Sequence, residues 1–230
     1  MQKKIIGITG CSGMLGRHLI NFFLKKKNFN LVCVSRRKVK IKNKRFKWKK
    51  LNLSLIKNEN KFKKLFKNVS VIIHAGSAVP SKNIKLVKND YLNTNIRSSK
   101  KLISFAKKNN IHLIFISGAI IYGNTLKKVK ENIKINNSKV LNYENSKRII
   151  DLHLLSMINK YKCKFTILRP SSIYGKGLKD DKIIIQLINK IKSGKKIMLK
   201  SPFEKINFIH ANDVANATFI SLIKKKIWCI

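Results

Sequence analysis

A short glycine-rich segment near the N-terminus constrains the fold of this chain more than any other feature. The segment reads TGCSGMLG and places Gly10, Gly13 and Gly16 three residues apart. It lies between a strand-like run, Lys4–Thr9, and a helix-like run, Met14–Lys27. A tight turn from strand to helix leaves backbone N–H groups that can bind a phosphate, and glycine lets a pyrophosphate approach the backbone. The segment therefore predicts a dinucleotide-binding unit. The alternative interpretation is that three small residues simply open an ordinary strand-to-helix turn with no ligand.

Strand-like and helix-like segments alternate along the chain. Strands are expected at Lys4–Thr9, Leu31–Ser35, Phe46–Leu51, Val69–His74, His112–Ser117 and Lys164–Arg169. Helices are expected at Met14–Lys27, Glu59–Phe66, Lys85–Lys108 and Tyr143–Lys160. Strands such as Leu113-Ile114-Phe115-Ile116 are apolar throughout, as strands covered on both faces must be. The order predicts an α/β fold, a Rossmann-like doubly wound parallel sheet with right-handed crossovers.

The pattern changes after Arg169. A loop at Pro170–Asp181 precedes a helix at Lys182–Ser193 and a short strand at Lys196–Leu199. The segment Asn207–His210 and a helix near Asp213–Lys225 follow. We assign residues 1–170 to an NAD(P)-binding domain and residues 171–230 to a small, incomplete substrate-binding portion interleaved with the last sheet elements. The last residues, 226–230, are apolar and look like the start of a strand, so we expect a truncated chain.

The charge of the chain is extreme, with 52 Lys and Arg against 9 Asp and Glu and a formal net charge of +43. Lysine, asparagine and isoleucine crowd every segment, which is typical of an AT-rich coding sequence, whereas a nucleic-acid footprint would be localised. We favour compositional drift, with weak, salt-sensitive attraction to nucleic acid. An RNA-binding protein on a dinucleotide fold stays open.

Composition also limits the compartment and the chemistry. No apolar run is long enough for a membrane span, and the N-terminus lacks a signal-peptide pattern. The four cysteines and five histidines are dispersed without metal-ligand spacing, so no metal site is expected. A reduced, cytoplasmic protein follows from these features.

The end of the second expected strand indicates the cofactor. NAD enzymes of this architecture place a carboxylate there to bind the ribose hydroxyls. This chain has Ser35, Arg36 and Arg37 instead, and no acid before Glu59. Because a guanidinium matches a 2′-phosphate, we expect NADP(H) in preference to NAD(H).

Tyr143 and Lys147 are four residues apart in an expected helix and therefore share one face. The lysine ammonium is expected to lower the pKa of the tyrosine toward the working range. A tyrosine of this kind can exchange a proton with a substrate hydroxyl during hydride transfer. A solvated helix face is the alternative interpretation of the same spacing.

Several motifs occur in one order along nearly the whole chain: TGCSGMLG, residues 72–76, Asn95, residues 116–123, Tyr143 with Lys147, residues 168–175 and residues 207–214. Their intervals resemble those of the extended short-chain dehydrogenase/reductases, the NAD-dependent epimerase/dehydratase family. The resemblance implies a cofactor site and a nucleotide-sugar substrate. It leaves a homodimer open.

The resemblance also implies individual roles. The pyrophosphate would lie against Gly10, Gly13, Met14, Leu15 and Gly16. Ser35 and Arg36 would meet the adenosine ribose, and Asn52 and Leu53 the adenine. Ala75, Gly76 and Ser77 would pass under the cofactor, braced by Asn95. Pro170 and Ser171 would flank the nicotinamide. Tyr143 would be the acid/base, and Lys147 would also bond the nicotinamide ribose.

One position departs from the family pattern. Four residues before Tyr122, where the family usually has serine or threonine to polarise the substrate oxygen, this chain has Gly118. Losing such a donor costs ~2–4 kcal/mol by analogy with oxyanion donors. The preceding residue, Ser117, is the candidate replacement. Two functions remain beside RNA binding: an NAD(P)-dependent sugar-nucleotide epimerase, dehydratase or reductase, and a catalytically weakened NADP(H)-binding module or sensor.

Overall fold

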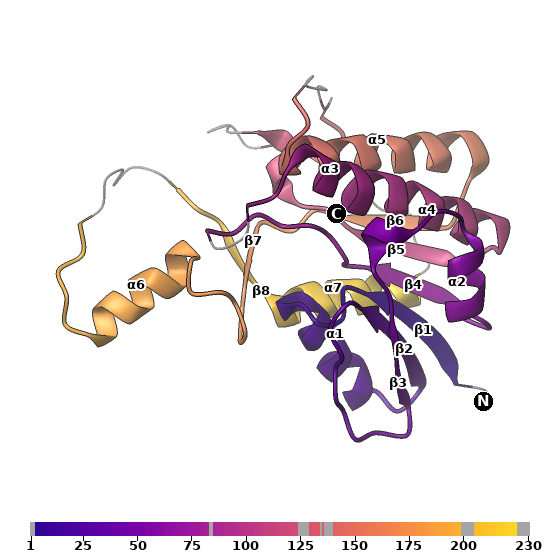
Figure 1. Cartoon of the computed structure of the whole chain (residues 1–230), viewed down its shortest axis with the longest axis horizontal. Helices are drawn as coiled ribbons and strands as arrows, with labels where there is room; N and C mark the ends of the chain where they lie inside the picture. The colour runs from indigo at the N-terminus through magenta and orange to yellow at the C-terminus, as the bar shows by residue number, and fades with distance from the viewer. Residues whose placement is uncertain are drawn as a thin grey trace.

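A six-stranded parallel sheet forms the centre of the chain in the computed structural model (Figure 1). The structure describes residues 3–82, 85–123, 129–133, 135, 140–198 and 205–224. The strand order is β3-β2-β1-β4-β5-β6, and every neighbouring pair is parallel. The strands are β1 (Lys4–Thr9), β2 (Phe29–Ser35), β3 (Phe46–Lys50), β4 (Val71–His74), β5 (His112–Ile116) and β6 (Phe165–Leu168). The predicted Rossmann-like fold is confirmed.

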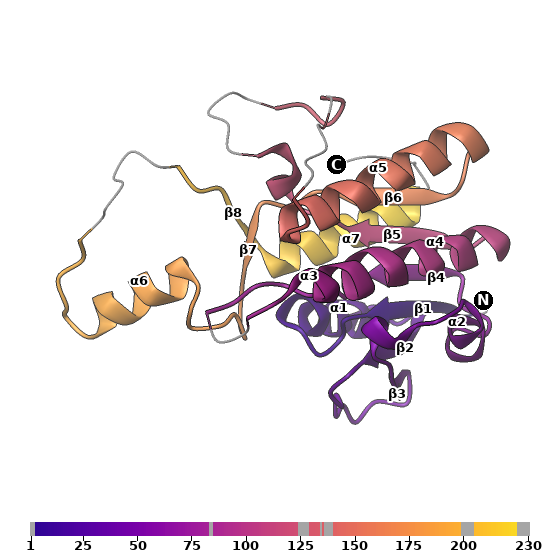
Figure 2. The same ribbon diagram turned by 45° about the horizontal axis from the view of Figure 1, so that its top comes forward.

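Helices cover both faces of this sheet because successive side chains of each strand point to opposite faces. In β4, Ile72 packs with α2 (Asn60–Leu65), α4 (Ser98–Lys108) and α5 (Tyr143–Tyr161). Its neighbour Ile73 packs in a second cluster with α1 (Met14–Lys25) and α7 (Ala211–Lys224). Figure 2 shows α4 and α5 together on one side of the strands. This arrangement explains why the strands are apolar throughout.

The expected helix at Lys85–Lys108 is present from Lys88 onward, but it is not a uniform α-helix. A short turn, α3 (Lys88–Asp90), leads into a π-helical segment, η2 (Tyr91–Arg97), before α4 begins. Wide π-helical turns occur most often at functional sites. Two 3-10 turns, η1 (Leu53–Leu55) and η3 (Ala119–Tyr122), complete the elements of this part of the chain.

The C-terminal part differs from the sequence prediction in two places. The expected loop at Pro170–Asp181 contains a strand, β7 (Ser172–Tyr174), which pairs in parallel with β8 (Phe208–His210). The expected strand at Lys196–Leu199 is wrong, since residues 195–198 are irregular and pair with no strand in the described part of the chain. Residues 226–230, the basis for expecting a truncated chain, lie outside the described residues.

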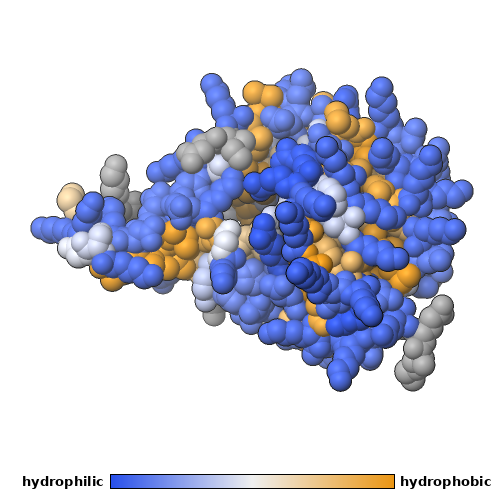
Figure 3. Space-filling view, turned by 60° about the horizontal axis from the view of Figure 1, so that its bottom comes forward, coloured by the Kyte–Doolittle hydropathy of each residue, from blue (hydrophilic) through white to orange (hydrophobic). Residues whose placement is uncertain are grey.

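Two helices of this part lie in contrasting settings. Helix α6 (Ile183–Lys192) projects away from the sheet, and Figure 3 shows hydrophobic surface on the projecting segment. Helix α7 instead returns to pack against α1. Among the described residues, we find no helix with the length and hydropathy needed to cross a membrane.

Candidate functional site

A cleft of about 2390 Å³ opens at the carboxyl ends of the parallel strands. In the strand order β2-β1-β4, the chain reverses direction across the sheet at β1, and ligands of open α/β sheets bind at such a point. Most of the predicted cofactor-binding residues line this cleft: Gly10, Gly13, Met14, Leu15, Gly16, Ser35, Arg36, Asn52, Leu53, Ala75, Gly76, Ser77, Pro170 and Ser171. Tyr143, Lys147 and Ser117 line it as well.

The glycine-rich turn packs closely against the loop that follows β4. Gly10 has a φ of +71°, and a Cβ built on it would lie 2.6 Å from the Cα of Gly76. A Cβ on Gly16 would lie 2.3 Å from the carbonyl oxygen of Gly10. Gly13 caps α1 without a side-chain hydrogen bond, so the first N–H groups of this helix face the cleft and can bind an anion. The turn therefore fits a pyrophosphate.

A buried polar relay fixes the floor of the cleft. The hydroxyl oxygen of Thr9 lies 2.6 Å from Nδ1 of His74, and Nε2 of His74 lies 2.8 Å from the hydroxyl of Ser99. The Thr9 hydroxyl also accepts a hydrogen bond from the backbone N–H of Gly76. Burial lowers the pKa of His74 to about 3, with a smaller contribution from the charge of Lys147. His74 is therefore a neutral structural residue, as its place in an apolar strand predicts.

Asn95 lies behind this floor, in the π-helical segment. Its side-chain oxygen accepts hydrogen bonds from the hydroxyl of Ser77 at 3.0 Å and the N–H of Ala78 at 2.7 Å. Its amide nitrogen donates to the hydroxyl of Ser146 at 2.9 Å. Asn95 thus joins the loop after β4 to the first turn of α5, which carries the Tyr143–Lys147 pair.

In the turn after β2, the side chain available to a ligand is that of Arg36 rather than that of Ser35. The Ser35 hydroxyl donates to the carbonyl of Arg37 at 2.7 Å and accepts from the indole N–H of Trp48 at 3.0 Å. The thiol of Cys11 donates to the same oxygen at 3.1 Å. Ser35 is therefore buried and engaged within the protein, whereas Arg36 is exposed and lines the cleft.

The predicted adenine side of the cleft is formed by the residues after β3. The side-chain oxygen of Asn52 accepts hydrogen bonds from the N–H and the hydroxyl of Ser54, at 3.2 and 2.9 Å. Leu53 lies against Gly76, where a Cβ would approach Cδ1 of the leucine to 2.6 Å. Asn52 thus shapes the turn, and Leu53 forms an apolar wall.

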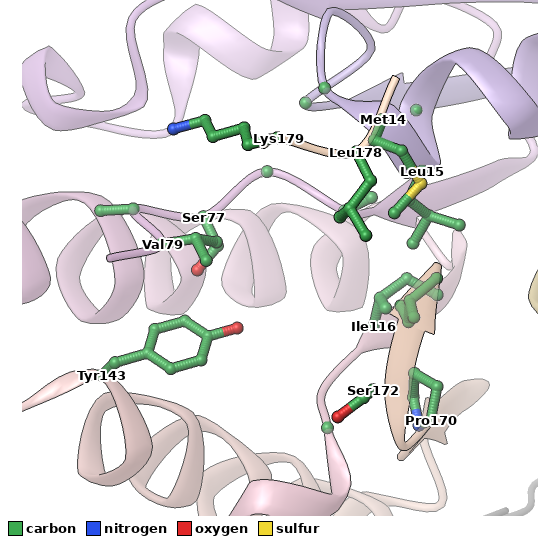
Figure 4. A pocket seen from close by; sticks show the side chains of 18 of the residues that line it. Met14, Leu15, Ser77, Val79, Ile116, Tyr143, Pro170, Ser172, Leu178 and Lys179 are labelled. Carbon is green, nitrogen blue, oxygen red and sulfur yellow. The ribbon is translucent and has the colours of Figure 1, made fainter. Parts of the chain in front are cut away.

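Tyr143 and Lys147 lie at the start of α5 and line another part of the cleft than the predicted adenine side. The ammonium of Lys147 donates to the carbonyl of Ile116 at 3.0 Å and lies 5.9 Å from the centre of the Tyr143 ring. Figure 4 shows the tyrosine hydroxyl pointing into the open space, toward Ile116 and away from the α5 backbone. The helix begins here because the side chain of Asn142 caps it by accepting from the N–H of Asn145 at 2.8 Å.

Burial dominates the protonation of this pair. Desolvation, and then the nearby Tyr91, raise the pKa of Tyr143 to about 12. Desolvation lowers the pKa of Lys147 to about 8, although the charge of Asp151 opposes the shift. The expected lowering of the tyrosine pKa is therefore wrong for this structure, because burial and the nearby Tyr91 both raise it. The tyrosine hydroxyl is protonated at neutral pH.

A scan against protein-family models matched the model described as "NAD dependent epimerase/dehydratase family" over residues 6–227. The chain belongs to the NAD-dependent epimerase/dehydratase family. The resemblance proposed from the sequence motifs is thus confirmed. A search of curated protein sequences found no significant match.

Solved structures of similar fold include enzymes that act on nucleotide sugars. A dTDP-glucose 4,6-dehydratase from Bacillus anthracis, in complex with NAD, has a TM-score of 0.80 and 21% sequence identity, covering 97% of this chain and 73% of that one. A UDP-N-acetylglucosamine 4-epimerase from Methanobrevibacter ruminantium, in complex with UDP-N-acetylmuramic acid, has a TM-score of 0.80 and 22% identity, with 96% and 73% covered. A UDP-glucuronic acid 4-epimerase from Bacillus cereus, in complex with UDP-glucuronic acid and NAD, has a TM-score of 0.79 and 20% identity, with 96% and 74% covered.

Within this epimerase/dehydratase fold, Gly118 is in an extended conformation that any residue can adopt. Its φ and ψ are 176° and 150°, and a Cβ would meet nothing closer than 3.7 Å. The neighbouring Ser117 lines the cleft, but its hydroxyl donates to Asp151 at 2.8 Å. A catalytic role for Ser117 would require this hydrogen bond to break, and that role stays a prediction.

The family's fold also brings together a buried pair that the sequence analysis did not identify. Arg169 donates to Asp151 through Nε at 3.1 Å, and to the hydroxyl of Tyr122 through Nη1 at 2.8 Å. The available signal was weak: Asp151 is one of only nine acids and follows Lys147 by four residues. Arg169 lies next to Pro170, whose carbonyl accepts from the N–H of Ala119 at 2.9 Å and fixes the predicted nicotinamide side of the cleft.

Proposed function

We propose that this chain is an NAD(P)-dependent sugar-nucleotide epimerase, dehydratase or reductase in which Tyr143 transfers the proton and Lys147 assists it. One observation carries the proposal. Tyr143 and Lys147 line the same cleft as the uncapped N-terminus of α1, so a phosphate-binding turn and a proton-transferring pair face one ligand space. The family and the nucleotide-sugar enzymes of similar fold support this assignment.

In this proposal, residues at different places in the cleft have different roles. When bound in this cleft, a nicotinamide cofactor would accept and return the hydride. Tyr143 holds a proton on its hydroxyl, because its pKa is raised to about 12, and can donate a hydrogen bond to a substrate oxygen. The Lys147 ammonium favours the phenolate when that proton moves. Asn95 braces the floor of the cleft, and Pro170 and Ser171 would flank the nicotinamide.

The preference for NADP(H) belongs to the proposal as well. Arg36 and Arg37 are exposed in the turn after β2 and line the cleft. No carboxylate lies there to repel a 2′-phosphate, because the first acid of the chain is Glu59. The buried Ser35 hydroxyl is hydrogen-bonded to Trp48 and Arg37, so the arginines would discriminate between NADP(H) and NAD(H).

Replacing Tyr143 tests the catalytic assignment. Tyr143→Phe removes only the proton-transferring hydroxyl, so kcat should fall at least ~100-fold while NADPH affinity changes less than about twofold. Single-turnover hydride transfer with dTDP-glucose, UDP-N-acetylglucosamine and UDP-glucuronic acid measures the rate, and fluorescence titration the affinity. Tyr161→Phe, an exposed tyrosine near the end of α5, is the matched control. Unchanged turnover in Tyr143→Phe would place the chemistry elsewhere.

Replacing Arg36 tests the cofactor assignment. Arg36→Ala should weaken NADPH binding about tenfold and NADH binding much less, since a charge-assisted contact to phosphate contributes roughly 1.5–3 kcal/mol. Lys40→Ala removes an exposed cation outside the cleft and controls for net charge. Equal affinities of the unaltered protein for NADPH and NADH at moderate salt would contradict the preference.

A second candidate function rests on Gly118. Without a hydroxyl at this position, and with the Ser117 hydroxyl bound to Asp151, the substrate oxygen lacks the donor that the family usually supplies. The chain would then bind NADP(H) as a weakened module or sensor. Tight NADPH binding without turnover of any of the three nucleotide sugars would favour this function.

A further inference from the structure

The Asp151–Arg169 ion pair is withdrawn from solvent. The side chains are 0% and 1% exposed, and Asp151 Oδ2 accepts both the Arg169 Nε–H at 3.1 Å and the Ser117 hydroxyl at 2.8 Å. Its other oxygen, Oδ1, is buried and has no hydrogen-bond partner among the described residues. Burying charges costs several kcal/mol per ion, and apolar residues would often be as stable. One of only nine acidic residues in the chain, Asp151, thus lies where its charge is costly to bury.

The carboxylate connects directly to the residues that hold Lys147. Asp151 lies four residues after Lys147 on α5, so both side chains project from the same face of the helix. Ser117, which donates to Asp151, follows Ile116, whose carbonyl accepts the hydrogen bond of the Lys147 ammonium at 3.0 Å. Asp151 therefore anchors the end of β5 at the point where that strand holds the lysine.

The charge of Asp151 also acts on Lys147, where it opposes the larger effect of desolvation. The titratable groups that face the ammonium are Tyr143 and Asp151 on α5 and His74 at the end of β4, with Arg169 behind Asp151 after β6. Burial keeps Tyr143 and His74 neutral, because it raises the pKa of the tyrosine to about 12 and lowers that of the histidine to about 3. Burial also raises the pKa of Asp151, and the charge of Arg169 and the hydrogen bond from Ser117 oppose that rise. The Asp151 carboxylate in turn favours the charged form of Lys147, which desolvation disfavours.

We propose that Asp151 is a positioning residue for the Tyr143–Lys147 pair, which keeps the buried Lys147 ammonium charged and holds the end of β5 against it. The inference rests on the proposed function, since the pair matters only if it transfers a proton. In this role Ser117 links Asp151 to β5 and does not contact the substrate. Arg169 balances the carboxylate and extends the network to Tyr122.

The experiment measures the protonation of Lys147 directly. Trace acetylation with acetic anhydride at a series of pH values, followed by peptide mass spectrometry, gives the pH at which half of the Lys147 amine is reactive. Asp151→Asn keeps the shape and removes the charge, so this half-point should fall from about 8 by about one pH unit. Glu59→Gln, at an ion pair with Lys108 on the surface, removes one carboxylate elsewhere and should leave the half-point unchanged.

Two further variants keep the test decisive. Asp151→Glu retains the charge and should restore the half-point. If Asp151→Asn does not fold, Asp151→Asn with Arg169→Gln removes the buried guanidinium together with the charge that balances it. This double variant should still lower the half-point, because the charge of Asp151 raises the pKa of Lys147. A half-point within 0.3 units of the unaltered protein in a folded variant, roughly a twofold change, would overturn the positioning role.

The outcome separates this inference from the proposed function. If the half-point falls as expected but neither NADPH nor NADH binds the unaltered protein, the proposed function fails and the electrostatic role of Asp151 stands. If NADPH binds and turnover depends on Tyr143, but the half-point does not move, the proposed function stands and Asp151 is merely structural. With both intact, NADPH binding by Asp151→Asn should decline at a lower pH than in the unaltered protein.

Discussion

Gly118 is the residue on which the two candidate functions proposed above differ. The backbone there is extended, and the nearest atoms to a Cβ are Cγ2 of Ile120 and the carbonyl oxygen of Pro170, both at 3.7 Å. The position has room for a serine side chain and does not depend on the special conformational freedom of glycine. What it lacks is a donor, and a single substitution supplies one.

We expect Gly118→Ser to change the free energy of unfolding by less than about 0.5 kcal/mol and to leave hydride transfer equal or faster, because the hydroxyl restores a donor to the substrate oxygen. Urea denaturation and single-turnover rates measure both. Gly123→Ser is the contrasting control, since Gly123 has a φ of +73° and a ψ of −171°, and its replacement should lower the free energy of unfolding by roughly 1–3 kcal/mol. A markedly slower Gly118→Ser enzyme would show that the serine hydroxyl does not serve the reaction.

At the scale of elements, the Thr9–His74–Ser99 relay joins β1, β4 and α4 under the cleft. The pKa of His74 is about 3 in the folded chain, below the value of 6.5 expected when it is exposed by unfolding. Between these values the unfolded chain binds the additional proton. Folding stability therefore falls as the pH falls from 6.5 toward 3.

We expect His74→Gln to flatten this acid dependence by up to about 1.4 kcal/mol per pH unit, because glutamine does not titrate. Urea denaturation between pH 4 and 7 measures the slope. His153→Gln, at a partly buried histidine, should leave most of the slope in place. An unaltered slope in His74→Gln would mean that other groups control acid unfolding, with His112 first among them because burial lowers its pKa to about 4.

Local patterns predicted the central sheet well, because each βα unit carries its own signal. The apolar run of β5 and the glycines before α1 are examples, and both lie within a few residues of the positions expected from the sequence. The pairing of β7 with β8 was not predictable in this way. It joins Ser172 to Phe208 across a long stretch of chain, and three-residue strands carry no periodic pattern.

The sequence predicted which residues line the candidate site from their spacing, but it did not predict the directions in which their side chains point. The four-residue interval placed Tyr143 and Lys147 on one face of α5, and the structure brings both to the cleft. The Ser35 hydroxyl points to Trp48, and the Ser117 hydroxyl to Asp151. These directions depend on contacts with distant elements, which neither composition nor spacing contains.

At the scale of the whole molecule, the 52 Lys and Arg residues behind the net charge of +43 are spread along the chain rather than gathered in one segment. Figure 3 shows hydrophilic side chains over most of the face in view. A binding footprint for nucleic acid would gather the cations along one groove or helix. The even spread of cations along the sequence is what compositional drift would produce.

We expect RNA affinity to be independent of sequence and to fall by roughly 10³-fold or more between about 50 and 200 mM salt, because released counterions drive such binding. Electrophoretic mobility shifts with several unrelated RNAs across a salt series measure this. Nanomolar, sequence-selective binding at physiological salt would instead identify the chain as an RNA-binding protein.

The packing of α7 on α1 has a consequence for how the chain is made. Phe219 of α7 contacts Phe22, Phe23 and Phe29, with ring centres 5.8, 6.3 and 6.1 Å apart. At ribosomal speeds of 5–20 residues per second, about 10–40 s separate the synthesis of the first three rings from that of the fourth. Until then, Phe22, Phe23 and Phe29 cannot pack against Phe219 of α7. We therefore expect a nascent chain to expose these rings, as a hydrophobic surface that a chaperone could bind, from the synthesis of Phe29 until that of Phe219.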